Sequence, residues 1–394
     1  MKNIPFRWIV AGVFMISSAL NYLDRQILAA VSPLIIAEFH LNNQGYGWIL
    51  SVFSITYAIS SPIAGLVLDR YGLTRGISAA VALWSAAGIG TGLASSLGGL
   101  LTARAILGIG ESAGLPSTGK LTHKYLQPKE RSLGAALSNI GLSVGAVTAP
   151  WMANLLVPRY GWRMVFVVAG VLGFLWIPLW WWMDRRAEKM PEAAESSSLL
   201  VRDILRDRQM WGFLAANVCS MTVYTLWTNW TTIFFSTHYG LSPVEANKLA
   251  PLPHFFAYFG GITGGAISYR LIAKGMAPLS ARRKALLICA ALMTTTVIVP
   301  WMPTPLSAAL VVSFSFFWAT GWGVSLYTMP VDAYGRRAGF AISLLTMAYG
   351  ILQIFVSPLI GGAIDHYGFR PVCLAAGLAP LLGYVIVSNT SREA

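Results

Sequence analysis

The sequence predicts an all-α membrane protein in which twelve transmembrane helices form two six-helix bundles. The chain is 56% hydrophobic and only 11% charged, whereas soluble domains carry roughly 25% charged residues. Its apolar stretches have about the length that a helix needs to cross a bilayer, roughly 20 residues. The least hydrophobic stretch, from Asp184 to Arg208, has six apolar stretches before it and six after it. These observations indicate a polytopic protein with a central linker.

The first bundle is expected over residues 1–183, a cytoplasmic linker over 184–209 and the second bundle over 210–394. The first apolar stretch is too long for a signal peptide and lacks a small-residue cleavage site, so it is expected to remain as the first helix. The twelve predicted spans are 8–36, 45–68, 74–94, 97–121, 132–156, 162–183, 210–237, 247–272, 284–302, 305–330, 338–363 and 370–388.

Two groups of apolar residues are expected at the membrane surface. In the linker, helical spacing among charges predicts a short amphipathic helix with the residues Leu199, Leu200, Ile204 and Leu205. At the end of the sixth span, an interfacial belt is predicted from Trp176, Trp180, Trp181 and Trp182.

The basic residues predict the orientation of the chain. The formal net charge of +13 could suggest a nucleic-acid partner, but 22 of the 28 lysines and arginines fall in segments on the same side as the N-terminus. This is the distribution that the positive-inside rule describes, and it places both termini in the cytoplasm. We therefore expect a multi-pass protein of a bacterial inner membrane, surrounded by lipid and without a nucleic-acid partner.

No enzyme, metal or cofactor site is expected. The three cysteines, Cys219, Cys289 and Cys373, lie in apolar spans without pairing or metal-ligand spacing. The chain has five histidines and no HExxH motif. Residues 114–120 spell most of a phosphate-binding loop, but Leu121 replaces the required Ser or Thr and no strand precedes it. These glycines, and those of 108–113, are expected to pack helices closely.

The two halves share a glycine-rich helix end followed by a basic turn. It occurs at 65–75 in the first half and at 264–270 in the second. At these residues the chain resembles the major facilitator superfamily, whose signature G-x-x-x-D-R-x-G-x-x-R is complete here, while Tyr269 replaces the aspartate in the second half. The resemblance implies a two-bundle transporter in which the signature and Arg104 are structural or gating residues. The signature residues are Gly65, Asp69, Arg70, Gly72 and Arg75.

A narrower resemblance covers most of the first half. The runs 21–25, 108–116 and 128–131, with Asn139 and small residues up to Pro150, are similar to the anion:cation symporters, and within them to hexuronate and sugar-acid permeases. The resemblance implies that Asp24 and Glu111 couple protons to substrate. It also implies that Tyr57 contacts the substrate. Leu142 and Met347 stand where some sugar-acid permeases have amides, which suits a less hydroxylated acid or a different hydroxyl pattern.

Two carboxylates and two arginines lie deep inside the first and fourth spans: Asp24, Arg25, Arg104 and Glu111. A charge at membrane depth costs at least about 2.5 to 3.5 kcal/mol, so such residues usually serve transport. The spacing of Arg104, Gly108, Glu111 and Thr118 predicts one polar face of the fourth span. A structural ion pair between Arg104 and Glu111 is the alternative. If a substrate anion alternately occupies and frees an arginine beside a carboxyl group, binding and protonation become linked.

Arg25 is the candidate for gripping a substrate carboxylate, because a guanidinium offers two parallel donors. It could instead be neutralised permanently by Asp24 or Glu111. Most aromatic residues of a bundle pack or lie at the interface, yet some are candidates for the substrate cavity. The complete predicted substrate-binding set is Arg25, Tyr22, Tyr57, Asn139, Tyr224, Trp227, Trp322 and Gln353.

The sequence thus predicts a monomeric, proton-coupled symporter that imports an organic anion by alternating access, with a sugar acid such as a hexuronate or aldonate as substrate. Alternatives are an anion exchanger or facilitator without proton coupling, and a transporter of small monocarboxylates. A membrane-embedded enzyme or sensor would need a catalytic constellation, for which the sequence has no motif.

Overall fold

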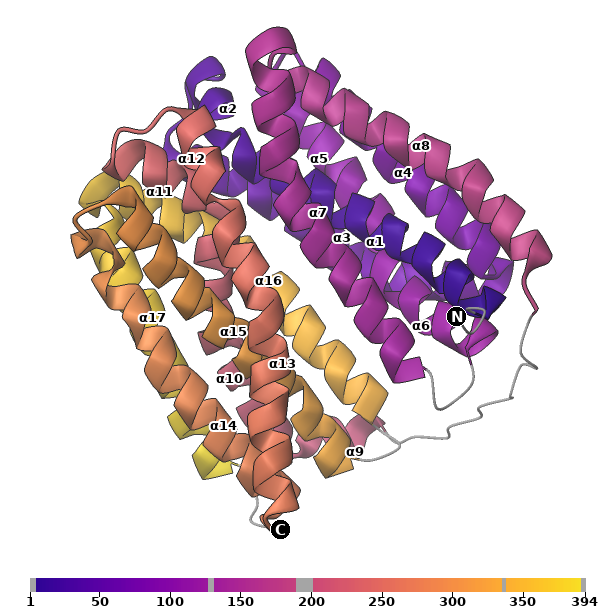
Figure 1. Cartoon of the computed structure of the whole chain (residues 1–394), viewed down its shortest axis with the longest axis vertical. Coiled ribbons are helices and arrows are strands. Elements are labelled where there is room, and N and C mark those ends of the chain that lie inside the picture. The colour runs from indigo at the N-terminus through magenta and orange to yellow at the C-terminus, as the bar shows by residue number, and fades with distance from the viewer. Residues whose placement is uncertain (1–4, 127–130, 189–200, 335–337, 391–394) are drawn as a thin grey trace. The chain divides into compact units, whose positions relative to one another are not determined.

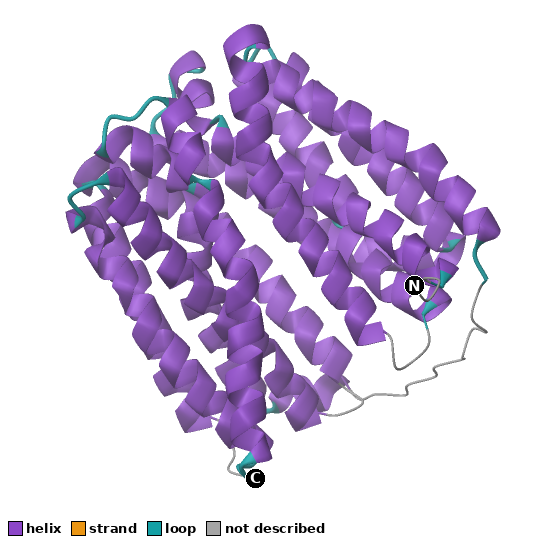
Figure 2. Cartoon of the chain, viewed as in Figure 1, coloured by secondary structure: helices purple, strands orange, loops and turns teal. Residues whose placement is uncertain are grey.

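The computed structural model describes residues 5–126, 131–188, 201–334 and 338–390, and it also leaves out some side chains within helices, including those of Asp69 and Asn139. All regular structure in these ranges is helical (Figures 1 and 2). The helices up to the linker are α1 (Phe6–Ala30), α2 (Ser32–Glu38), α3 (Asn43–Tyr71), α4 (Leu73–Leu93), α5 (Leu97–Glu111), α6 (Gly114–Tyr125), α7 (Arg131–Tyr160) and α8 (Trp162–Arg186).

Contacts divide the chain into two units. The first comprises Met1–Leu41 and Trp48–Glu195, and the second comprises Asn42–Gly47 and Ser196–Ala394. The helices after the linker are α9 (Val201–Arg206), α10 (Arg208–Asn229), α11 (Thr231–His238), α12 (Pro243–Leu249), α13 (Pro251–Ala273), α14 (Pro278–Met293), the 3₁₀ helix η2 (Thr294–Trp301), α15 (Pro305–Tyr334), α16 (Ala338–Tyr367) and α17 (Phe369–Thr390).

The predicted fold class is confirmed, since helices occupy most of the described residues in each of the twelve expected spans. Eight helices among the described residues are long and apolar enough to cross a membrane by themselves. Several of the expected spans are divided, into α1 and α2, α5 and α6, α10 and α11, and α14 and η2, and the first and last of these still belong to the eight. The first break precedes Pro33, which lacks the N–H that would continue the helix.

Tyr-Gly pairs mark the ends of four helices or their caps. Gly72, Gly161, Gly240 and Gly368 all have positive φ angles and all follow a tyrosine. A residue with positive φ just after a helix is usually glycine because a Cβ disfavours that conformation. The recurring Tyr-Gly pair therefore marks helix ends that can be recognised in the sequence.

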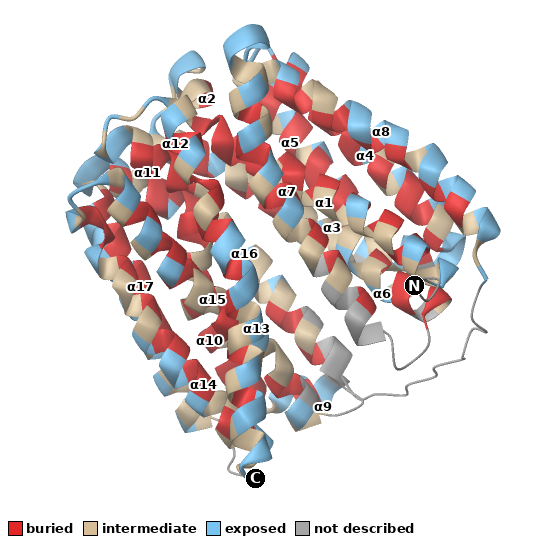
Figure 3. Ribbon diagram, in the orientation of Figure 1, coloured by how far each residue is buried: buried red, intermediate tan, exposed pale blue. Residues whose placement is uncertain are grey.

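The first unit is held together by small residues between helices. A Cβ atom at Gly145 of α7 would come within 3 Å of the Leu23 backbone nitrogen on α1, and Ala146 and Ala149 on the same helix are buried. These residues belong to the motif that resembles the sugar-acid permeases. Their role here is close helix packing, which fixes α1 along α7. In Figure 3 the buried residues gather on the helix faces that turn toward neighbours.

The predicted tryptophan belt is only half correct. Trp181 and Trp182 are exposed, but Trp176 and Trp180 are buried. Both buried rings contact Phe14 of α1 edge-on, and the two indole rings stack on each other with their centroids 5.5 Å apart. They sit on the inner face of α8, so they belong to the packed core of the unit.

Arg163 and Glu38 form an exposed ion pair in the first unit. Arg163 at the start of α8 donates to both carboxylate oxygens of Glu38 at the end of α2, and the indole of Trp162 donates to the same carboxylate. Chiefly through the Arg163 hydrogen bonds, the pKa of Glu38 lies below its usual range. The pair is therefore charged at neutral pH.

The linker is partly described. α9 covers Val201–Arg206, while Leu199 and Leu200 of the predicted amphipathic helix lie outside the described residues. Ile204 is buried and Leu205 is exposed, so one side of this short helix is packed. Because the described helices end at Arg186 and resume at Val201, the exact linker bounds stay a prediction.

Candidate functional site

Arg25 and Glu111 form a buried ion pair in the first unit. The Nε of Arg25 on α1 donates to Oε2 of Glu111 at 2.5 Å. The Arg25 guanidinium also lies over the rings of Phe53 and Tyr57 on α3, at 4.9 and 4.7 Å from their centroids. Three helices thus hold one guanidinium. The side chain of Arg25 keeps 25% exposure while that of Glu111 has none, so a solute can reach the arginine first.

The position of Glu111 follows from the break in the fourth span. α5 ends at Glu111 and α6 begins at Gly114, and Pro116 at the start of α6 has no N–H to bond the preceding turn. Interrupted helices recur at the binding sites of membrane transporters because they present side chains and free backbone groups inside the bundle. The second oxygen of the Glu111 carboxylate, Oε1, has no hydrogen-bond partner among the described residues.

The ion pair that the structure shows for Glu111 is with Arg25. Arg104 is buried, and its guanidinium lies over the Phe166 ring at 5.4 Å. It remains within electrostatic range of both Glu111 and Asp24. Arg104 is therefore a second positive charge shared by two carboxyl groups.

Asp24 faces away from the ion pair. It is 2% exposed, and its Oδ1 would lie 3.6 Å from a Cβ atom placed at Gly88 of α4. That oxygen has no hydrogen-bond partner within the described part of the chain. The direction agrees with the turn of about 100° between successive helical residues. Asp24 and Arg25 therefore project into different parts of the unit.

The predicted single polar face of the fourth span is wrong in one respect. Arg104, Gly108 and Glu111 belong to α5, whereas Thr118 lies on α6, beyond the break. A Cβ atom at Gly108 would lie 3.1 Å from the backbone nitrogen of Tyr57. Gly108 therefore packs α5 against α3, as expected for a close-packing glycine, and it brings Tyr57 toward Arg25.

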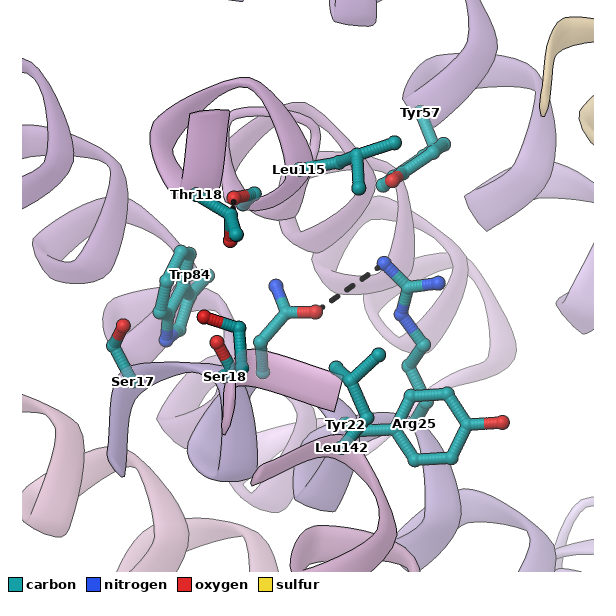
Figure 4. Close-up of a pocket in the computed structure, with 12 residues that line it drawn as sticks. Ser17, Ser18, Tyr22, Arg25, Tyr57, Trp84, Leu115, Thr118 and Leu142 are labelled. Carbon is teal, nitrogen blue, oxygen red and sulfur yellow. Dashed lines mark hydrogen bonds between the residues drawn. The ribbon is translucent and has the colours of Figure 1, made fainter. Parts of the chain in front are cut away.

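A cavity of about 140 Å³ opens beside Arg25 (Figure 4). It contains three of the predicted substrate-binding residues, Tyr22, Arg25 and Tyr57. In Figure 4, Arg25 and Tyr57 lie at one end of the group, and Ser17 and Trp84 lie at the other. The complete lining is Ser17, Ser18, Asn21, Tyr22, Arg25, Tyr57, Trp84, Gly114, Leu115, Thr118, Ser138 and Leu142.

The sequence reasoning missed the neutral polar part of this cavity, which is formed by Ser17, Ser18, Trp84 and Ser138. Serine and tryptophan are common in membrane helices, so none of these residues stands out by itself. The spacing of Ser18, Tyr22 and Arg25 at intervals of four and three residues would have placed them on one face of α1.

Two predicted residues cannot be placed. The side chains of Asp69 and Asn139 lie outside the described part of the structure. Of the remaining signature residues, Gly65 lies in α3, Arg70 and Arg75 are exposed, and Gly72 separates α3 from α4 with φ +79°.

In the second unit, the structure brings together two of the four predicted residues. The Tyr224 ring meets the Tyr349 ring edge-on at 6.0 Å, and the Gln353 amide donates to the Tyr349 hydroxyl at 2.6 Å. Trp227 and Trp322 are completely buried. The Trp227 indole approaches the Thr296 hydroxyl at 3.4 Å. Both tryptophans pack in the interior of this unit.

Comparisons with known proteins agree with this architecture. The model of the Major Facilitator Superfamily matches residues 14–350. The hexuronate transporter of Escherichia coli (strain K12) is 26% identical, over 98% of this chain and 94% of the relative. A probable galactarate/D-glucarate transporter of Bacillus subtilis (strain 168) is 23% identical, over 98% and 92%.

Among solved structures, a D-xylose-proton symporter is similar in fold. Its TM-score is 0.78 at 14% sequence identity, over 99% of both chains. A match at this identity shows the fold alone, whereas the family model covers most of the chain. The chain belongs to the Major Facilitator Superfamily and is a multi-pass membrane transporter, not an enzyme.

Proposed function

We propose that this protein imports a sugar acid together with a proton by alternating access. The observation that carries the proposal is the Arg25–Glu111 pair beside a cavity in which Arg25 is the one charged residue of the described lining. A guanidinium is suited to a carboxylate because it can donate two parallel hydrogen bonds. The relatives named for hexuronate and for galactarate or D-glucarate support a sugar acid as substrate.

Charge balance explains why such a site needs a proton. Arg25 and Glu111 together carry no net charge, so adding a substrate carboxylate alone would leave one uncompensated negative charge inside the membrane. That is costly because the surroundings do not solvate a charge as water does. Protonation of Glu111 removes its charge and frees Arg25 for the substrate. One anion and one proton then restore neutrality, so binding of each favours binding of the other.

Asp24 is proposed as the second coupling group. Its Oδ1 lies on the side of α4, and the charges of both Arg104 and Arg25 act on it. It is therefore poorly placed to share the substrate carboxylate and well placed to respond to the charge of the site. Protonation of Asp24 would accompany the return of the carrier across the membrane.

The alternatives use the same fold. An exchanger or facilitator would move the anion without a proton, and a transporter of small monocarboxylates would need no hydroxyl recognition. We also propose that both termini are cytoplasmic, that the membrane is a bacterial inner membrane and that the protein is a monomer. The signature around Gly65 and Arg75 is proposed to hold the cytoplasmic ends of the bundles.

The decisive experiment measures substrate and proton movement together. The purified protein in proteoliposomes is given glucuronate, galacturonate, gluconate or galactonate outside, and the external pH is recorded with a dye. Symport should alkalinise the medium in step with uptake of at least one acid. Uptake that leaves the pH unchanged would establish an exchanger or facilitator, and liposomes without protein provide the background.

Asp24→Asn should still bind substrate but fail to concentrate it. An asparagine resembles a permanently protonated Asp24, so one half of the cycle should stop while the binding site stays intact. Uptake driven by a pH gradient is compared with ligand-induced thermal stabilisation of the same variant. Asp332→Asn, at the exposed pair with Arg282, is the matched control and should transport normally. Full concentrative uptake by Asp24→Asn would make Asp24 a structural residue.

A further inference from the structure

We propose that the end of the cavity away from Arg25 is a hydroxyl subsite, formed by Ser17, Ser18, Trp84, Thr118 and Ser138, and that it selects hydroxylated acids with a single carboxylate. The inference rests on the proposed function, in which Arg25 holds the substrate carboxylate. It adds the orientation of the substrate, the residues that contact its hydroxyl groups and the class of acid that is excluded.

The subsite continues along the face of α1 that carries Arg25. Ser18 lies seven residues before Arg25, which corresponds to about 10 Å along the helix axis. Both residues line the same cavity. An extended six-carbon acid covers this distance, with its carboxylate at Arg25 and its hydroxyl groups toward Ser18. In Figure 4, Trp84 and Thr118 lie beside the serines at that end.

Two buried donors in the cavity have no acceptor among the residues that the structure describes. These are the indole N–H of Trp84, which is 1% exposed, and the side-chain amide nitrogen of Asn21, which is 6% exposed. The nitrogen atom of Trp84 lies on the side of its ring that faces Ser17 (Figure 4). A buried donor without a partner is costly, so it calls for an acceptor such as water or ligand. A substrate hydroxyl oxygen that reaches either residue would be such an acceptor.

The charges of the residues that line the cavity determine whether a substrate with one or with two carboxylate groups fits the site. Among the lining residues that the structure describes, Arg25 alone has a charged side chain, and the subsite residues are all neutral. A hydroxyl group suits such surroundings, because serine, threonine and indole groups can pair with it. A second carboxylate would be buried beside neutral groups and without a counter-ion, which is strongly unfavourable. The site therefore favours uronates and aldonates over aldarates.

Leu142 strengthens the assignment to the subsite residues. It lines the same cavity and offers no hydrogen bond. Recognition of hydroxyl groups consequently falls to the serines, Thr118 and Trp84. The substrate hydroxyl groups would therefore contact side-chain hydroxyl and indole groups at this end of the cavity.

The test compares acids that differ in one feature. Binding to the purified full-length protein is measured by calorimetry for glucuronate, galacturonate, gluconate and galactonate, and the tightest of these is the reference acid. Glucarate and galactarate add a second carboxylate, and hexanoate keeps six carbons without hydroxyl groups. We expect the reference acid to bind at least about tenfold more tightly than either aldarate and than hexanoate, the ratio that corresponds to one lost hydrogen bond.

Two variants then test the subsite directly. Trp84→Phe removes the N–H donor and keeps the aromatic ring, and Thr118→Val removes a hydroxyl at nearly constant volume. Each should weaken the reference acid by about tenfold and leave hexanoate unchanged. Trp151→Phe, on an exposed part of α7, is the matched control and should change neither.

The outcomes separate this inference from the proposed function. If none of the acids binds the unmodified protein, the proposed function itself fails. If acids bind and are transported, but aldarates bind as tightly as the reference acid, the single-carboxylate selection is wrong. Equal weakening of the reference acid and hexanoate by Trp84→Phe and Thr118→Val would overturn the hydroxyl subsite, as would no weakening at all.

Discussion

Replacing Arg25 by lysine should abolish high-affinity binding of the substrate. A lysine keeps the positive charge but cannot donate two parallel hydrogen bonds to a carboxylate. Its ammonium group also cannot spread over Phe53 and Tyr57 while it bonds Glu111, as the guanidinium does. Truncating one partner of a buried, hydrogen-bonded charge pair costs about 2 to 5 kcal/mol, a factor of about 30 to several thousand in affinity, and this is the loss expected for Arg25→Ala.

Calorimetry on Arg25→Lys and Arg25→Ala, with the reference acid as ligand, measures this loss. The control is Arg163→Lys, because Arg163 also pairs with a glutamate but lies at the exposed end of α8. Both sets of variants should insert and fold, which thermal unfolding checks. Near-normal affinity in Arg25→Lys would show that planar recognition of a carboxylate is not the role of Arg25.

Glu111→Gln should separate binding from coupling. The glutamine resembles the protonated glutamate, so Arg25 loses its anionic partner and is free for the substrate. We expect binding to be retained or tightened and to lose its dependence on pH. Accumulation driven by a pH gradient should fall to background, while exchange of substrate down its own gradient persists.

The measurement is made in proteoliposomes with the same acid inside and outside, so that exchange and net uptake are followed in parallel. Glu38→Gln is the matched control, since Glu38 pairs with Arg163 outside the cavity. It should transport like the unmodified protein. If Glu111→Gln still concentrates substrate under a pH gradient, coupling belongs to Asp24 alone or does not occur.

Much of the architecture follows from the sequence because it depends on local properties. A helix crosses a bilayer only if its own residues are apolar over sufficient length, so the spans can be predicted segment by segment. The Tyr-Gly pairs, such as Tyr71-Gly72, end helices through the conformation of one residue. The family signature from Gly65 to Arg75 is likewise visible without a structure.

The sequence also determined that Asp24, Arg25 and Glu111 are exceptional, because charged residues are rare at membrane depth. Three of the predicted substrate-binding residues, Tyr22, Arg25 and Tyr57, line one cavity of the first unit. Their roles stay predictions until substrate binding is measured.

The pairing of the charges required the tertiary structure. Arg104 and Glu111 are seven residues apart, which places them about 10 Å apart along a helix. The ion pair that the structure shows for Glu111 comes from Arg25 on another helix, α1. The sequence alone left the partner of Glu111 open because it does not state how α1 rotates against α5.

Packing between helices also decided which ordinary residues acquire special positions. Trp84, Ser17 and Ser138 come from three helices and meet only because small residues let those helices approach closely. By the same process, Trp176 and Trp180 become core residues although they resemble an interfacial belt. The sequence determined the helices and the rare charges, while the rotation and spacing of the helices decided which side chains share the cavity.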